Sequence, residues 1–179
     1  MNGSSFAPEV FTADYIGKPG ERVFYLQARA ETAAHTYLAE KQQISVLAEK
    51  LKELLLMVGA NDTVASALPD RDPALAIQEP VEPEARLGAI GLAFEEQEDA
   101  VIVFLQPAEE GDLEVGEEDD DDEDEFDLRL ELRRDQARAF VLHVNAIVAE
   151  GRPTCQLCGL PMDPAGHQCP ASNGHRLGG

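Results

Sequence analysis

Four side chains near the C-terminal end have the types and the spacing of a metal site. Cys155 and Cys158 form a Cys-x2-Cys pair, and eight residues separate them from the His-x-Cys pair His167 and Cys169. A Cys-x2-Cys turn directs two thiolates at one ion, and Zn²⁺ prefers four nitrogen and sulfur ligands in a tetrahedron at structural sites. The pattern therefore predicts a closed, structural Zn²⁺ site in a zinc-ribbon-like knuckle over residues 151–179.

Two other interpretations of the same cysteines stay open. A redox dithiol would use only Cys155 and Cys158, and no thioredoxin-like βαβ pattern precedes them. A catalytic zinc needs an open coordination position, which four protein ligands do not leave. The zinc deaminase signature also needs an upstream His-x-Glu, which this sequence lacks. His175 is a reserve fourth ligand should His167 point away.

Four basic residues form a second candidate site. Lys41, Arg133 and Arg134 lie at the starts of two predicted helices, and Arg22 begins a predicted strand. Because helix N-termini attract anions, these side chains could hold a phosphate or another small anion between the two halves of the chain. The simpler interpretation, which we favour, is that they are exposed residues between a strand and a helix.

No residue stands out as catalytic. The sequence has no G-x-S-x-G, P-loop, G-x-G-x-x-G or H-E-x-x-H motif. His143 falls at the edge of the apolar face of a predicted helix and is interpreted as a boundary residue. His35 is expected in a strand near the sheet surface. The missing motifs argue against an enzyme without excluding one.

Acidic residues dominate the charge of the chain. The formal net charge is −21, from 14 Lys and Arg against 35 Asp and Glu. Residues 109–125 hold 13 of those acids and no base, which leaves 22 acids and 14 bases elsewhere. Because nucleic-acid binding depends on Lys and Arg that displace counterions, we do not expect a nucleic-acid partner. The acidic run itself is predicted to be a solvated loop insertion, although it could also mimic nucleic acid on a basic protein.

The cysteines also indicate the cellular compartment of the protein. All three lie within 15 residues, in a chain without a predicted signal peptide or an apolar run long enough to span a membrane. Clustered cysteines of odd number favour metal binding in a reducing compartment. We therefore expect the cytoplasm, and no membrane partner.

Hydropathy periodicity predicts the elements that must position these residues. Alternating apolar residues predict strands over residues 11–17, 22–30, 35–39, 87–94, 100–106 and 126–132. Apolar residues at helical spacing predict one helix from Lys41 to Gly59 and a second from about Arg134 to Gly151. The proline-rich segment 59–86 is predicted to be an acidic linker with one short helical turn near Ala74.

The two halves share the order of three strands followed by an amphipathic helix. Residues 24–27 resemble residues 103–106, and an offset of 93 positions sets Gln43 on Gln136 and Leu47 on Phe140. We interpret this as an internal duplication of a βββα unit, although coincidence within an α+β protein stays an alternative.

The predicted fold class is α+β, with two three-stranded antiparallel sheets that each precede a helix and share one core about a pseudo-two-fold axis. The predicted domains are residues 10–58 for the first unit, 59–86 for the linker, 87–150 for the second unit with the insertion 109–125, and 151–179 for the knuckle.

The chain resembles an uncharacterised actinobacterial family, a conserved hypothetical or domain of unknown function, over nearly its whole length. The resemblance rests on residues 17–22 (GKPGER), on residues 40–43 (EKQQ) and, most specifically, on the tail from Cys155 to Gly174. It implies a soluble cytoplasmic protein with one compact body, and brings no activity or substrate. The long acidic insertion departs from the shorter acidic loop that the resemblance implies.

Together these observations predict a zinc-binding protein that acts as a non-enzymatic binding or adaptor protein for a protein partner. The alternative is a small-ligand binding protein or an enzyme that uses an anion site between the two units.

Overall fold

The computed structural model describes residues 3–59, 70–109, 126–150, 155–160, 162 and 167–171. The first part of the chain forms β1 (Ser4–Phe6), β2 (Val10–Ile16), β3 (Val23–Ala30), β4 (Ala33–Ala39) and α1 (Lys41–Met57). The second part forms the 3-10 turn η1 (Pro73–Leu75), β5 (Ala85–Glu95), β6 (Ala100–Pro107), β7 (Leu128–Arg133) and α3 (Arg134–Ala149). The predicted mixture of strands and two helices is confirmed, and β1 is an addition to the prediction.

Parts of three predicted segments lie outside the described residues. These are residues 60–69 of the linker, residues 110–125 of the acidic insertion, and residues 151–154, 161, 163–166 and 172–179 of the knuckle. Within the described ranges, neither helix is both long enough and apolar enough to cross a membrane.

All seven strands belong to one sheet, in the order β1-β7-β6-β5-β4-β3-β2. Within each half the strands are antiparallel, as predicted. The expectation of two separate three-stranded sheets is wrong, because β4 and β5 pair in parallel and join the halves edge to edge. β1 pairs in parallel with β7 at the far edge. A short three-stranded sheet with one helix buries too little to be stable alone, and the joint removes two exposed edges.

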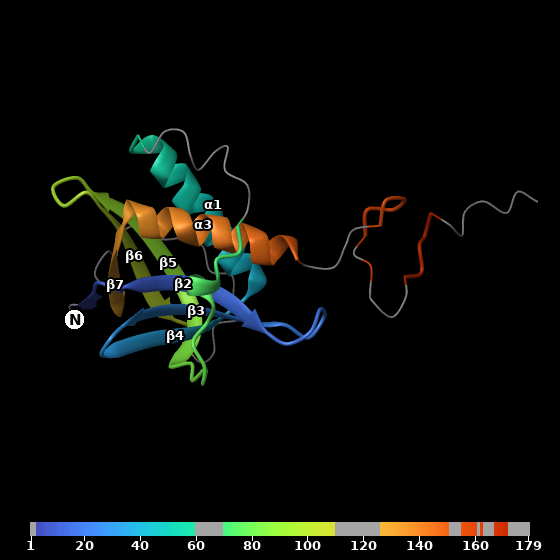
Figure 1. Cartoon of the computed structure of the whole chain (residues 1–179), viewed down its shortest axis with the longest axis horizontal. Coiled ribbons are helices and arrows are strands. Elements are labelled where there is room, and N and C mark those ends of the chain that lie inside the picture. The colour runs from blue at the N-terminus through green and yellow to red at the C-terminus, as the bar shows by residue number, and fades with distance from the viewer. Residues whose placement is uncertain are drawn as a thin grey trace, which may run out of the picture.

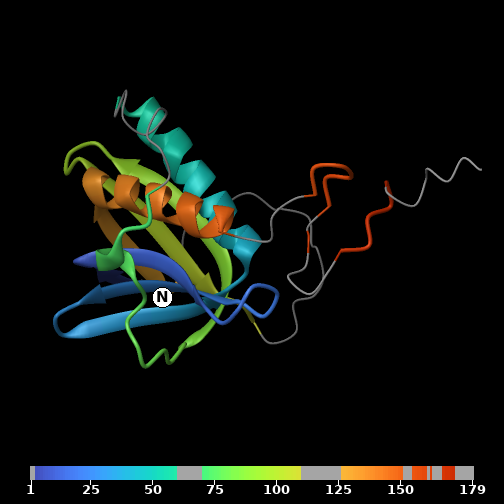
Figure 2. The same cartoon turned by 45° about the vertical axis from the view of Figure 1, so that its right-hand side comes forward.

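The sheet curves strongly. Its two end strands, β1 and β2, are separated in the chain by only residues 7–9. Four extended peptide units reach roughly 14 Å, so the edges of the sheet must come that close. Figures 1 and 2 show the resulting curved sheet with α1 and α3 lying together across one side of it.

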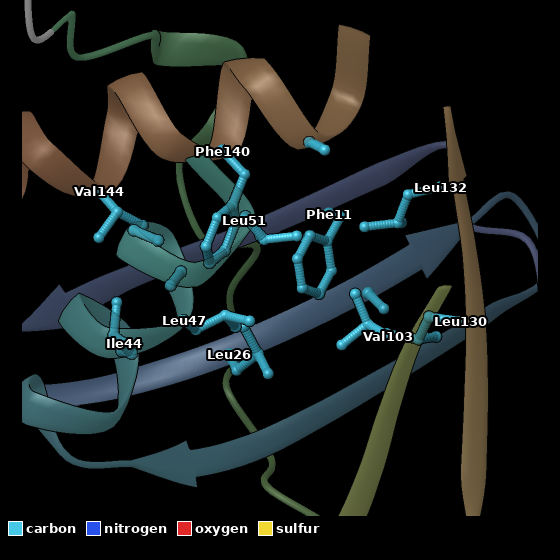
Figure 3. Packing of buried hydrophobic residues seen from close by; sticks show 14 of the residues in the cluster. Phe11, Leu26, Ile44, Leu47, Leu51, Val103, Leu130, Leu132, Phe140 and Val144 are labelled. Carbon is cyan, nitrogen blue, oxygen red and sulfur yellow. The ribbon is translucent and has the colours of Figure 1, made fainter. Parts of the chain in front are cut away.

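The core lies between the two helices and the concave side of the sheet. Phe140 of α3 stacks on Phe11 of β2, with ring centroids 4.6 Å apart. Figure 3 shows residues from both halves interleaved in this core. The fully or almost fully buried side chains that it labels are Phe11, Leu26, Ile44, Leu47, Leu51, Val103, Leu130, Leu132, Phe140 and Val144. Both predicted apolar helix faces thus point into one shared core.

Residues 70–84, which we call the strap, cross β2, β3 and β4 on their way to β5. The Thr12 hydroxyl donates to the carbonyl of Leu75. Gln27 binds Gln78 through both ends of its amide, at 3.0 Å from the backbone N–H and 3.4 Å to the carbonyl. These contacts explain why polar residues on the outer face of the strands are buried, since buried polar groups need hydrogen-bond partners. The predicted helical turn near Ala74 is η1, in the middle of the strap.

One glutamine at the start of each helix ties that helix to the other half. Gln43 accepts a hydrogen bond from the N–H of Glu40 at 2.9 Å and donates to the carbonyls of Leu87 and Gly88 at 3.0 and 3.3 Å. Gln136 likewise accepts from the N–H of Arg133 at 2.9 Å and donates to the carbonyls of Pro8 and Glu9 at 2.8 and 3.0 Å. Each side chain thus caps its own helix and holds the segment where the first long strand of the opposite half begins.

Replacing Gln136 by Ala should lower the free energy of unfolding by about 1–3 kcal/mol, because buried backbone groups lose their partners. Urea denaturation followed by far-UV circular dichroism measures this change. Gln42→Ala is the matched control, since Gln42 is exposed at the same helix end as Gln43. Equal stability of the two variants would contradict the tying role.

Candidate metal centre

The structure brings Cys155, Cys158, His167 and Cys169 together. One ligand atom from each lies within 4.8 Å of all the others, so the group could hold a metal ion. The Sγ atoms of Cys155 and Cys169 are 3.7 Å apart, and Sγ of Cys158 is 3.3 Å from Nε2 of His167. In a tetrahedral zinc site with Zn–S bonds of about 2.3 Å, two sulfurs lie about 3.8 Å apart. The spacing is therefore that of ligands around one ion, and it is far too long for a disulfide.

A tight backbone turn presents the first two sulfurs. The N–H of Gly159 donates to the carbonyl of Cys155, and the N–H of Cys155 donates to the carbonyl of Leu160, both at 2.8 Å. Gly159 has φ +71°, a conformation that suits glycine because a Cβ would be strained there. The sequence Cys-x2-Cys-Gly thus folds into the turn that its spacing predicts.

The surroundings of Cys155 favour its thiolate form. Backbone N–H groups of Cys158 and Leu157 point at its sulfur and lower the pKa of the Cys155 thiol to about 6. Cys155 and Cys169 are buried, whereas Cys158 and His167 are partly exposed. A thiolate is the form that binds metal, so the backbone of this turn favours Cys155 as a metal ligand. His175, the reserve ligand, lies outside the described residues.

The four predicted anion-binding residues do not form one cluster. Lys41 begins α1, while Arg134 donates to the carbonyl of Val58 just beyond its other end, at 2.8 Å. α1 has 17 residues, so its ends are roughly 24 Å apart.

The other two bases are divided in the same way between the two ends of α3. Arg133 precedes α3 and pairs with Asp135 at 3.0 Å. Arg22 stacks at 4.0 Å over the ring of Tyr15, whose hydroxyl donates to Glu150 at the end of α3. Arg134 is also paired, with Asp99 at 2.5 Å. A single phosphate cannot contact all four side chains in this arrangement.

His143 was predicted at the edge of the apolar face of its helix, but it is fully buried, in contact with the strap and β2. Its Nδ1 accepts the N–H of Asp72 in the strap at 3.2 Å, and its Nε2 lies 3.8 Å from Oδ2 of the buried Asp14. His35 is a partly exposed residue of β4, 3.1 Å from Glu84, which agrees with the predicted surface position.

Sequence patterns missed the polar network around this histidine. Arg71 of the strap bridges Asp14, at 3.3 Å, and Glu150 at the end of α3. Tyr15 completes the network, with its hydroxyl 2.7 Å from Glu150 and 3.2 Å from Arg71. The signal in the sequence is Asp14, an acid in the middle of a strand. The network fastens the strap and the end of α3 to β2.

Most of the chain matches a known protein family. A family model described as a protein of unknown function, DUF3090, matches residues 5–169. The chain belongs to the DUF3090 family. The match runs from β1 to Cys169, so all four clustered ligands fall inside the region that defines DUF3090. No curated protein and no solved structure matches the DUF3090 chain. The predicted membership of an uncharacterised family is confirmed, and the actinobacterial source stays a prediction.

Burial of His143 should make the stability of this DUF3090 protein depend on pH. Desolvation lowers the pKa of His143 below 6.5; Asp14, Asp72 and Glu150 oppose this shift, and Arg71 adds to it. The unfolded chain therefore takes up a proton at a pH where the folded chain does not. The contribution of His143 to the free energy of unfolding is complete above about pH 6.5. It is lost as the pH falls from there through the pKa of His143 in the folded protein.

Urea unfolding from about pH 7.5 to about pH 5.5 measures this dependence. His143→Gln should give a shallower fall in unfolding free energy, whereas the control His35→Gln should keep the wild-type slope. A wild-type slope in His143→Gln would contradict the assignment.

Proposed function

We propose that this protein is a non-enzymatic binding or adaptor protein in which a structural Zn²⁺ ion orders a zinc-ribbon-like C-terminal knuckle for a protein partner. The observation that carries the proposal is the convergence of three sulfurs and one imidazole nitrogen within 4.8 Å. The knuckle exposes two leucines, Leu157 at 73% and Leu160 at 49%. Exposed leucines on a small metal-ordered turn are suited to contact another protein surface.

Zinc suits this ligand set better than other common ions. Thiolate and imidazole ligands exclude Mg²⁺ and Ca²⁺, which prefer oxygen. Four protein ligands complete a tetrahedron and leave no open position for substrate or water, which supports a structural role. The site needs reduced thiols, and the cytoplasm provides them, in keeping with the proposed location.

Charge narrows the class of partner. A net charge of −21 repels phosphate backbones, so a protein partner is favoured over nucleic acid. The proposed acidic insertion adds to that repulsion and is a candidate contact for a basic partner surface.

The alternative anion site draws little support. Its four bases lie at opposite ends of the two helices, and Arg133 and Arg134 already pair with carboxylates. The groove found between the halves has an apolar floor of Val46, Leu47, Ile90 and Leu92. A surface of this kind suits hydrophobic groups better than a phosphate.

We further propose that the body arose by duplication of a βββα unit. Two parallel pairings support this: Phe6 with Leu130, and Ala85 with Tyr37. Phe6 and Ala85 are 79 positions apart in the sequence. Tyr37 and Leu130 are 93 positions apart, and 93 is also the offset between Gln43 and Gln136. The glutamine contacts repeat the first offset, since Pro8 and Glu9 precede Leu87 and Gly88 by 79 positions. Contacts that are reciprocal between halves are those of a two-fold relation.

The strand registers correct one detail of the predicted alignment. Phe24 pairs with Ala39, and Val101 pairs with Leu132, which follows Ala39 by 93 positions. Under the duplication Phe24 therefore corresponds to Val101, two residues before the predicted Val103. The longer turn between β2 and β3, compared with that between β5 and β6, accounts for the shift.

The purified full-length chain should bind one Zn²⁺ ion, detected by elemental analysis. Co²⁺ in its place should give the visible absorption of a tetrahedral thiolate site. Cys158→Ser and His167→Gln should each weaken metal binding by at least about tenfold, because each removes one of four ligands. His35→Gln is the control, since His35 lies on β4.

Chelation separates a structural role from others. Removal of the ion should make the tail sensitive to protease while the far-UV circular dichroism of the sheet and helices stays unchanged, because the ligands lie outside that core. Absence of stoichiometric metal in the wild-type chain would refute the zinc proposal.

Affinity capture with the full-length protein should recover the same protein partner repeatedly, and Cys158→Ser should recover less of it. His35→Gln should recover the wild-type amount. Repeated capture without a partner, or equal capture by Cys158→Ser, would count against the adaptor proposal.

A further inference from the structure

A polar pocket, distinct from the apolar groove that contains Val46, lies where the two halves of the sheet meet. Its volume is about 310 Å³. Small-molecule sites occupy about 300–1,000 Å³. Its walls come from both parallel joints of the sheet, because Tyr37 pairs with Ala85 and Ser4 pairs with Leu128. The other lining residues are His35, Glu84, Pro107 and Asp127.

Acidic groups and hydrogen-bond acceptors dominate the polar part of this lining. Glu84 and Asp127 supply two carboxylates, and Ser4 and Tyr37 supply hydroxyl oxygens. A protonated His35 would balance only one of the two carboxylates. Among the described residues that line the pocket, none is a Lys or an Arg. The charge of the pocket therefore favours a cationic ligand.

Backbone hydrogen bonds and ring contacts hold these groups in place. The N–H of Ser4 donates to the carbonyl of Asp127 at 2.9 Å, and the N–H of Glu84 donates to a carbonyl of β4 at 2.8 Å. The ring of His35 meets Phe6 edge to face, with centroids 5.0 Å apart. Its Nδ1 lies 3.1 Å from Oε1 of Glu84. A site that is formed before its ligand arrives loses little entropy on binding.

The hydroxyl of Tyr37 points to a ligand in this pocket. Tyr37 is 4% exposed, and its hydroxyl makes no hydrogen bond within the part of the chain that the structure describes. Buried polar groups nearly always have a partner. Burial, together with the charges of Glu84 and Asp127, raises the pKa of Tyr37 to about 12, so the hydroxyl stays protonated near neutral pH. It can donate one hydrogen bond and accept another.

The spread of the charged groups indicates an organic cation rather than a metal ion. Over the described residues, the group whose ligand atoms converge on one point is the Cys/His group of the tail. His35, Glu84 and Asp127 do not converge in this way, so one ion could not bind all three. Apolar atoms of Pro107 and Leu128 complete the lining and suit a hydrocarbon segment.

We propose that this pocket binds a small organic amine in its ammonium form. An ammonium group has three N–H donors and no acceptor, which matches two carboxylates and the oxygen of a phenol. Glu84, Asp127 and Tyr37 hold the ammonium group, and the hydrocarbon part lies against Pro107 and Leu128. The pocket shares no residue with the Cys/His group, so this inference does not rest on the zinc proposal.

Butylamine, which is a cation near neutral pH, tests the proposal by NMR. The probe is titrated at constant pH and ionic strength into full-length protein labelled on tyrosine rings and leucine methyl groups. The signals of Tyr37 and Leu128 should shift saturably, with a Kd of about 1–10 mM for so small a ligand. Those of Tyr15 and Tyr25 should stay in place, since neither residue lines the pocket. Butanol, which lacks the charge, should bind at least about tenfold more weakly.

Two conservative variants test the assigned residues, with Leu128 as the reporter. Asp127→Asn and Tyr37→Phe should each weaken butylamine binding by at least about tenfold, because each removes a partner of the ammonium group. Glu82→Gln is the matched control, since Glu82 is an exposed acid of the strap outside the pocket, and it should keep the wild-type affinity. Far-UV circular dichroism checks that each variant is folded.

Three results would overturn the proposal. The first is the absence of a saturable shift at Tyr37 and Leu128 up to about 100 mM butylamine. The second is a shift that butanol or sodium chloride reproduces at the same concentration, since the pocket would then not recognise an ammonium group. The third is wild-type affinity in both Asp127→Asn and Tyr37→Phe.

Discussion

Phe140 stacks on Phe11, and this contact joins the last helix of the chain to one of its first long strands. Gln43 and Gln136, at the two helix starts, also link the halves. Each donates a hydrogen bond to a backbone carbonyl of the opposite half. Neither half can therefore bury its helix by itself, because the surface that the helix needs belongs to the other half. The parallel pairs β4–β5 and β1–β7 follow from the same exchange. A core built in this way should fold as one cooperative unit.

Local periodicity predicted most of the fold, because each element shows its buried face in its own sequence. Ile44, Leu47 and Leu51 mark one helix face, and alternation in β6 and β7 marks the strands. The joining of the halves into one sheet was not predictable in the same way, since edge pairing between β4 and β5 involves backbone groups that every sequence has. β1 was missed because three residues are too few to show a period.

Site residues were predictable where one short segment carries the whole pattern. The Cys/His group meets this condition, because its four members follow each other closely in the sequence and their ligand atoms lie close enough together to hold one ion. The network of Asp14, Arg71 and His143 does not, since its members come from β2, the strap and α3. The four bases do not cluster for a related reason. Lys41 and Arg134 were correctly placed at helix starts, but α3 starts beside the end of α1, so the two starts lie far apart.

The outer faces of β2 and β5, which correspond under the proposed duplication, differ in chemistry and are covered by different residues. On β2, Thr12 and Asp14 are polar and buried, and the strap meets them with a carbonyl and a guanidinium. The registers of the two strand pairs set Gly91 and Ala93 of β5 at the same positions. Small apolar residues there offer no hydrogen bonds, and Phe126 rests on Gly91, with its ring 3.1 Å from the place of a Cβ. The cover on this side is therefore apolar: Phe126 contacts Gly91 and lies against Phe104, with ring centroids 5.3 Å apart, where the strap supplies polar groups to β2.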